Sequence, residues 1–155
     1  MREWQAKAAF NLIIDYGTAN DLAGARALYD ALEKLGAAHA DEPALRKLQA
    51  KEAVNLITAY GTANDLAGAR ALYDPLEKLA AAHAGEPALR KLQAEAAVNL
   101  INAYGATNDL ASARDLARRA EDYLLSGEFL SNVRNSFGEL RAAQFQANLR
   151  SLIEE

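Results

Sequence analysis

The chain contains no cysteine, which excludes disulfide bonds, thiolate zinc sites, iron–sulfur clusters and a cysteine nucleophile. Its 9 glycines and 3 prolines are too few to separate many short strands. No apolar run reaches the ~18 residues of a membrane-spanning helix, and no N-terminal stretch has the pattern of a signal peptide. A cytoplasmic location is the default expectation, although a chain that had lost a targeting segment would look the same.

Charge of one sign is also not concentrated anywhere in the sequence. The formal net charge is −4, and acidic and basic residues alternate along the chain, as they do on solvated helical surfaces. Since nucleic-acid-binding proteins usually have a basic face or a basic total, no nucleic-acid partner is expected. Alanine, leucine, glutamate, arginine and lysine are abundant, and their high helix propensity predicts an all-α fold.

The main positive signal is an internal repeat with a period of 44 residues. Residues 8–51 and 52–95 are identical at all but eight of the 44 positions, and a third copy follows until Arg114. A fixed period of about 20–50 residues is typical of stacked repeats, in which each unit packs only against its neighbours. The sequence therefore predicts one domain over 1–155, with repeats at about 1–41, 42–85 and 86–125.

Each copy has the pattern of two amphipathic helices. In the second copy, Pro43 suits the first turn of a helix, and Asn64-Asp65 supplies the cap of the next helix. Apolar residues recur at helical spacing in both segments. They are Leu45, Leu48, Ala53, Leu56, Ile57 and Tyr60 in the first, and Leu66, Ala69, Leu72, Tyr73, Leu76, Leu79 and Ala80 in the second. Tight connections between long helices predict three antiparallel helix pairs.

These residues resemble the signature of the tetratricopeptide repeat family. Asn55-Leu56 and Ala59-Tyr60 are similar to its first helix, and Asn64-Asp65-Leu66 with Ala69 and Tyr73 is similar to its turn and second helix. The resemblance implies a right-handed α-solenoid, in which the small Ala69 allows close helix approach and Tyr73 packs into the adjoining pair. The period of 44 exceeds the usual period of about 34 and resembles the long-helix variants of the family.

The last part of the chain, 126–155, still has helical patterns but not the repeat. Breaks are predicted near Ser126-Gly127 and near Gly138. One apolar face contains Phe129, Val133, Phe137 and Leu140, and a second contains Ala142, Phe145, Leu149 and Leu152. We interpret the segment as a helical cap over the last repeat, because the ends of a solenoid need a polar outer surface. An amphipathic helix that pairs with another chain is the alternative.

No group of residues in the sequence has the spacing that catalysis or metal binding requires. His39 and His83 occupy equivalent positions 44 apart, but further ligands at suitable spacing are missing. A histidine near a helix C-terminus, where it complements the helix dipole, is the favoured interpretation. We therefore expect no enzymatic activity, no cofactor and no metal.

The resemblance implies a protein-protein interaction module, because the first helices of the family line a concave groove that binds a peptide or helix of a partner. The residues expected to face this groove are Asn11, Ile14, Thr18, Lys51, Asn55, Thr58, Thr62, Asn99 and Asn102. An asparagine row suits an extended peptide, since each amide can both donate and accept. Asparagines that are only hydrogen-bonded locally are the alternative. Val54 and Val98 replace the lysine of a carboxylate clamp, which disfavours binding of a C-terminal carboxylate.

Self-assembly is a different function that the same pattern allows. Near-identical copies stack on one another, so an exposed first helix could stack on another chain and bury Trp4, Phe10 and Ile14. The near identity of two copies also fits an engineered or recently duplicated array. If the chain self-assembles, the sequence predicts a homo-oligomer formed through the terminal helices. If it is an interaction module, the partner is a different protein or peptide.

Overall fold

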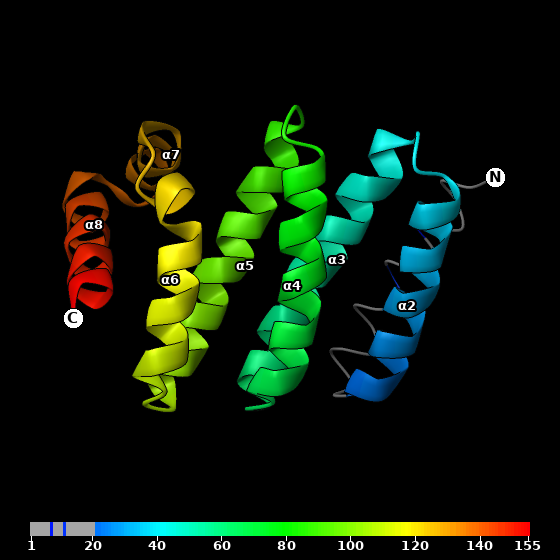
Figure 1. Ribbon diagram of the computed structural model, residues 1–155, viewed down its shortest axis with the longest axis horizontal. Coiled ribbons are helices and arrows are strands. Elements are labelled where there is room, and N and C mark those ends of the chain that lie inside the picture. Colours follow the sequence, from blue (N-terminus) through cyan, green and yellow to red (C-terminus); the bar gives the residue numbers. More distant parts are fainter. Residues whose placement is uncertain (1–6, 8–10, 12–20) are drawn as a thin grey trace. The chain divides into compact units, whose positions relative to one another are not determined.

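The structure is a computed structural model that describes Lys7, Asn11 and residues 21–155. Helices form almost all of this part of the chain, and no strand occurs in it, so the predicted all-α class is confirmed (Figure 1). The helices are α2 (Leu22–Ala38), α3 (Pro43–Thr62), α4 (Leu66–Ala82), α5 (Pro87–Ala106), α6 (Leu110–Leu124), α7 (Gly127–Phe137) and α8 (Glu139–Glu154). Among them, none combines the length and apolar character that crossing a lipid bilayer requires. The right-handed twist of the array stays a prediction.

The chain divides into two compact units, residues 1–96 and 97–155, and their boundary falls inside α5 rather than between two repeats. In the first unit, α3 packs against both α2 and α4. In the second unit, α6 packs against α7 and α8, which also pack against each other. Within each unit, helices that follow one another along the chain thus pack together, as expected where repeats bury apolar surface against adjacent repeats.

The second helix of every copy begins at the same kind of capping residue. Asp21, Asp65 and Asp109 each accept a hydrogen bond from the backbone N–H three positions later, at 2.9, 2.9 and 3.1 Å. Asn64 and Asn108 precede two of these caps with φ values of 62° and 61°, which asparagine adopts more readily than most residues. The predicted Asn-Asp signal therefore provides both the sharp turn and the N-cap.

The apolar stripes of the second copy form the core between α3 and α4. Ala69 and Tyr73 are both 0% exposed, the burial that the resemblance implies for them. The other residues of the two stripes are buried, except that Leu48, Leu66 and Leu79 are half-buried. The helical spacing of these residues thus predicted the buried side of both helices correctly.

A polar contact recurs after 44 residues between the second helix of one copy and the first helix of the next. Tyr29 of α2 is hydrogen-bonded to Gln49 of α3, and Nε2 of Gln93 in α5 lies 3.4 Å from the Tyr73 hydroxyl. Burial raises the pKa of Tyr29 to about 12. A buried phenol needs a hydrogen-bond partner, and the following copy supplies it.

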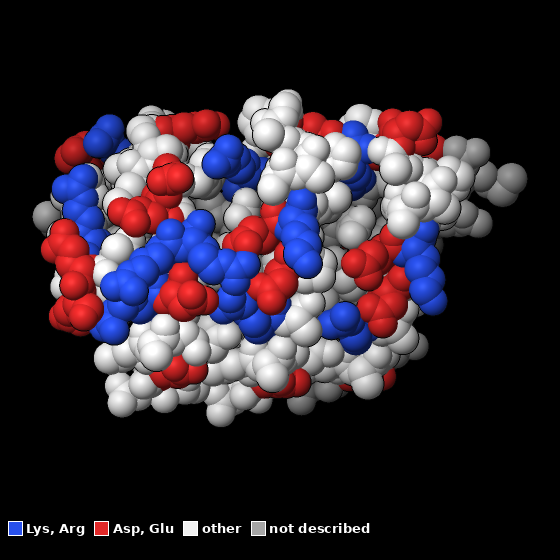
Figure 2. Space-filling model, viewed as in Figure 1, with Lys and Arg blue, Asp and Glu red and all other residues white. Residues whose placement is uncertain are grey.

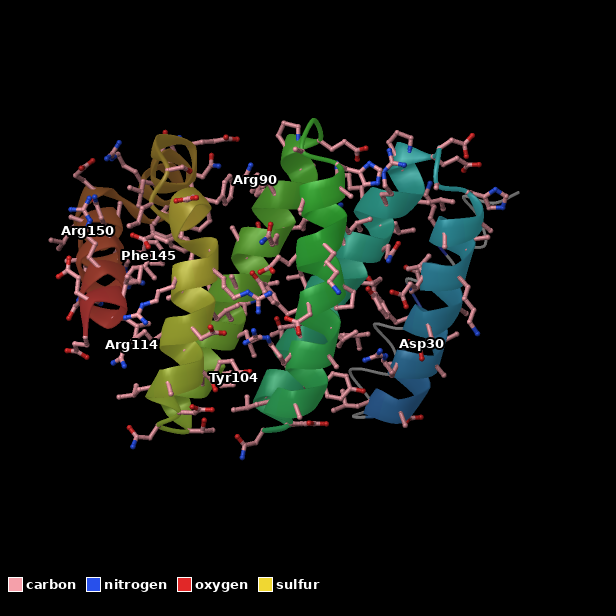
Figure 3. The ribbon with its side chains drawn as sticks, viewed as in Figure 1. Asp30, Arg90, Tyr104, Arg114, Phe145 and Arg150 are labelled. Carbon is pink, nitrogen blue, oxygen red and sulfur yellow. The ribbon has the colours of Figure 1, made fainter. Side chains whose placement is uncertain are left out.

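The C-terminal helices fold back onto α6 in the second unit. Arg114 of α6 points toward α8 (Figure 3), where its Nε donates to the Leu152 carbonyl at 3.0 Å. Arg118 donates to the Ile153 carbonyl at 2.9 Å. These bonds satisfy carbonyl groups that lack intrahelical partners at the end of α8. This packing is what the interpretation of the segment as a cap requires.

The predicted breaks in this segment are present, but one predicted apolar face is wrong. Ser126 caps α7, and Gly138, with a φ of 89°, separates α7 from α8. Phe129 is 7% exposed, whereas Phe137 and Leu140 are 65% and 82% exposed. The break at Gly138 interrupts the helical phase, so Leu140 no longer shares a face with Phe129, whereas Phe137 is the last residue of α7 and is exposed at its end.

Candidate functional site

The outer side of α3 carries four of the residues that the sequence assigned to a binding groove. Lys51, Asn55, Thr58 and Thr62 are all exposed, and we call them the polar row of α3. Their spacing of four, three and four positions places them on one side of the helix. The opposite side of the same helix is buried in the core. The row is therefore a continuous polar surface on a helix that tertiary packing holds in place.

The two threonines of the row are bonded within the helix. Thr58 Oγ1 donates to the Val54 carbonyl at 3.0 Å, and Thr62 Oγ1 donates to the Thr58 carbonyl at 2.9 Å. A hydroxyl that donates in this way keeps its lone pairs as acceptors. Thr62 therefore offers a partner an acceptor oxygen rather than a donor.

The asparagine of the row is also bonded locally, through one of its two polar ends. Nδ2 of Asn55 donates to Oε1 of Glu52 at 3.2 Å. No described residue donates to its carbonyl oxygen Oδ1. Asn55 thus has the local partner of one sequence interpretation, and its role in binding a ligand stays a prediction.

Beneath the row lies Glu52, a buried acid that sequence reasoning missed. Glu52 is 0% exposed, and its Oε2 has no hydrogen-bond partner among the described residues. Burial raises the pKa of this carboxyl from 4.5 to about 7, and the bond from Asn55 opposes part of that rise. The signal was available, because position 52 falls within the apolar stripe, four residues from both Leu48 and Leu56. The other two copies have alanine there.

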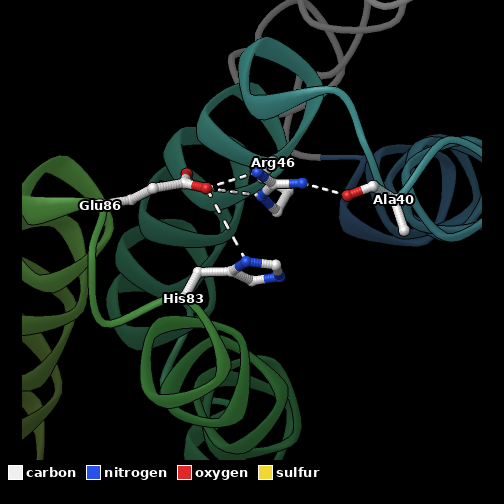
Figure 4. Close-up of polar contacts among 4 residues, drawn as sticks. All are labelled: Ala40, Arg46, His83 and Glu86. Carbon is white, nitrogen blue, oxygen red and sulfur yellow. Dashed lines mark hydrogen bonds and ion pairs between the residues drawn. The ribbon is translucent and has the colours of Figure 1, made fainter.

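A second polar cluster joins the second copy to the start of the third (Figure 4). Arg46, only 8% exposed, donates to Oε1 of Glu86 from Nε at 3.0 Å and also from Nη2, while Nη1 donates to the Ala40 carbonyl. Nδ1 of His83 lies 3.8 Å from the same Oε1. Arg46 lowers the pKa of the Glu86 carboxyl. All polar partners here belong to the fold, so the cluster is a contact between repeats.

The predicted histidine pair occupies helix ends in the structure. His39 and His83 are the C-cap residues of α2 and α4, and both are half-buried. In the part of the chain that the structure describes, no three histidine, aspartate or glutamate residues gather as a metal site would require.

The remaining predicted groove residues are not part of the candidate site on α3. Ile14 and Thr18 lie outside the described residues, whereas Asn11 is exposed. Asn99, half-buried, and Asn102, exposed, lie on the part of α5 that belongs to the second unit. The described candidate site is therefore the polar row of α3 together with Glu52.

The charged surface contains ion pairs rather than a field of one sign. Arg26 bonds Asp30 on α2 at 2.8 Å, and Arg70 bonds Asp74 on α4 at 2.9 Å, both one helical turn apart. Figure 2 shows basic side chains next to acidic ones across the face it displays. Such pairs are typical of a solvated helix surface and contribute little stability each.

Comparison of the chain with protein-family models, curated proteins and solved structures finds no match. The resemblance to the tetratricopeptide repeat therefore rests on the residues of this sequence.

Proposed function

We propose that the chain is a protein-protein interaction module of the tetratricopeptide type, and that the polar row of α3 binds an extended peptide of the partner. The observation that carries the proposal is Asn55, whose Oδ1 is unbonded on an exposed helix face. Its neighbours in the row add a positive charge at Lys51 and an acceptor oxygen at Thr62. The module would act in the cytoplasm without catalysis or a cofactor.

The dimensions of the row suit a short extended segment. At about 1.5 Å of rise per residue, the distance from Lys51 to Thr62 corresponds to about 16 Å along the helix axis. An extended peptide rises about 3.3 Å per residue, so about five residues match this length. The acceptors of the row complement the backbone N–H groups of such a peptide, and Lys51 complements an acidic side chain or a backbone carbonyl.

A displayed library of random 12-residue peptides tests the proposal. Peptides that bind the full chain are synthesised, and their affinities are measured for wild type and for Asn55→Ala. We expect a loss of roughly 5- to 10-fold, the effect of about one net hydrogen bond. The matched control is Asn148→Ala, which removes an exposed asparagine from α8. Equal affinity for wild type and Asn55→Ala, with circular dichroism unchanged, would contradict the assignment.

Self-assembly is the second candidate function. The residues assigned to it from the sequence, Trp4, Phe10 and Ile14, lie outside the described residues. A different observation favours it, because Phe137 and Leu140 expose large apolar side chains on either side of the α7–α8 break. Light scattering on dilution through the micromolar range tests it. A wild-type chain that is monomeric throughout this range excludes self-assembly. Phe137→Ser and Leu140→Ser should be monomeric in either case.

A further inference from the structure

We propose that Glu52 is a positioning residue for Asn55: its carboxylate holds the amide NH2 group inward, so that Oδ1 faces the partner, and protonation of Glu52 releases this orientation. The inference rests on the proposed function of the polar row of α3. It adds that peptide binding to the row weakens on acidification and that the second copy alone has this control, since the first and third have alanine at the position.

The orientation follows from the chemistry of the two groups. An ionised carboxylate has no hydrogen to donate, so only the NH2 end of the Asn55 amide can bond to it. This bond is present at 3.2 Å between Nδ2 and Oε1. With Nδ2 held by a group that is 0% exposed, Oδ1 is the end of the amide left for a ligand. Glu52 thus acts on the surface through Asn55 without contacting the ligand itself.

Protonation changes what Glu52 can do. The proton comes from solvent and binds Oε2, which has no partner among the described residues. The neutral acid can then donate from Oε2 to an amide oxygen, so the Asn55 amide can turn over and bring Oδ1 inward. In that orientation Asn55 presents NH2 to the partner, and an acceptor for a backbone N–H is lost.

The surroundings of Glu52 allow this proton transfer near neutral pH. Burial raises the pKa of the carboxyl to about 7, and the only opposing influence is the bond from Asn55. No charged residue of α2 or α4, which both pack against α3, is among the influences on this pKa. The charged residues of these two helices are Arg26, Asp30, Glu33 and Lys34 on α2, and Arg70, Asp74, Glu77 and Lys78 on α4.

The first test observes the asparagine without any ligand. The side-chain amide signals of Asn55, assigned by their loss in Asn55→Ala, are followed by NMR in the ¹⁵N-labelled full chain from pH 5.5 to 8.5. We expect them to shift with a midpoint near pH 7, whereas the amide of Asn148 stays constant. The matched variant Glu52→Gln keeps the size of the side chain and removes the titration. Asn55 signals that do not titrate, or that titrate equally in Glu52→Gln, overturn the proposal.

The second test uses a library peptide that loses affinity on Asn55→Ala, contains no His, Cys, Asp or Glu and is acetylated at its N-terminus, so that the peptide itself does not titrate between pH 6 and pH 8. We expect wild type to bind it roughly 5- to 10-fold more weakly at pH 6 than at pH 8, again about one hydrogen bond. Glu52→Ala, which installs the residue of the third copy, should bind equally at both pH values. Circular dichroism checks that it folds.

The outcomes separate the two proposals. A peptide that depends on Asn55 but binds wild type equally at pH 6 and pH 8 overturns the positioning role and leaves the binding function intact. If no selected peptide depends on Asn55, the proposed function of the row fails, and the NMR titration alone decides whether Glu52 orients the amide.

Discussion

Arg46 and Glu86 lie 40 positions apart in the sequence and form an ion pair between the first helix of the second copy and the N-cap of α5. The same guanidinium also bonds the Ala40 carbonyl, in the connection between α2 and α3. One buried side chain thereby joins the start of α3 both to the connection that precedes it and to Glu86, which comes near only in the folded repeat. A glutamate precedes both Pro43 and Pro87, but leucine stands one period later, at position 130.

Replacing this arginine tests whether the contact stabilises the stack. Arg46→Lys keeps the charge but cannot reproduce the forked donor geometry that reaches both Glu86 and the Ala40 carbonyl. We expect Tm to fall by about 3–6 °C, measured by circular dichroism. Arg141→Lys is the control, because Arg141 is an exposed arginine on α8. Equal effects of the two substitutions would argue against a specific contribution.

The buried carboxyl of Glu52 predicts an unusual pH dependence of stability. Its pKa is about 7 in the folded chain against an ordinary 4.5, so between these values the folded state binds more protons than the unfolded state. The free energy of unfolding therefore falls as pH rises through this window, and the loss is complete above about pH 7. We expect the free energy of unfolding of Glu52→Ala to exceed that of wild type by about 2–3 kcal/mol at pH 8. This difference should disappear as the pH is lowered to about 4.5, where the Glu52 carboxyl is protonated in the folded chain.

Chemical denaturation at several pH values measures this difference. Glu95→Ala, which removes an exposed glutamate from α5, is the control and should leave the pH profile of stability unchanged. A difference between wild type and Glu52→Ala that is constant from pH 4.5 to pH 8 would show that the Glu52 carboxyl titrates normally.

Pro75 interrupts the hydrogen bonding of α4 and offers a route to a more stable chain. It lies inside the helix, where proline removes a backbone N–H and crowds the preceding turn. α2 has the same sequence as α4 except at two positions, and Ala31 stands at the proline's position. We expect Pro75→Ala to raise the free energy of unfolding by about 1–3 kcal/mol. The reciprocal Ala31→Pro should lower it, and a stability loss on Pro75→Ala would disprove this account.

Ala69 tests the helix register that the resemblance implies. It is 0% exposed in the core between α3 and α4, so the three additional carbons of a leucine would overfill the contact. We expect Ala69→Leu to cost about 1–3 kcal/mol in denaturant unfolding. Ala71→Leu is the control, because Ala71 is exposed on the same helix. If both variants unfold like wild type, the close approach at Ala69 is not limiting.

Much of the fold could be predicted from the sequence because its signals are local or periodic. The caps at Asp65 and Asp109 need only a side chain three positions from a backbone N–H. The buried stripes follow from a spacing that every α-helix shares. Local periodicity failed at Leu140, where it was extended across the break at Gly138 that had itself been predicted, and at Phe137, the exposed last residue of α7.

The candidate site was only half predictable for the same reason. The exposed positions of Asn55, Thr58 and Thr62 follow from the helix phase, but the state of their polar atoms does not. Asn55 is held by Glu52, and the threonine hydroxyls are bonded to their own helix. Glu52 stood in the apolar stripe of the sequence, yet its burial and raised pKa depend on what packs around it.

The sequence by itself determined the elements: helices, their caps, their apolar faces and the 44-residue unit, because these depend on interactions within one or two turns. Only the tertiary structure decided which polar groups meet. Arg46 with Glu86 and Tyr73 with Gln93 join residues 40 and 20 positions apart. Neither pair exists until helices from successive copies pack together and remove water from between them, and hydrogen bonds in such places replace hydration that burial has taken away.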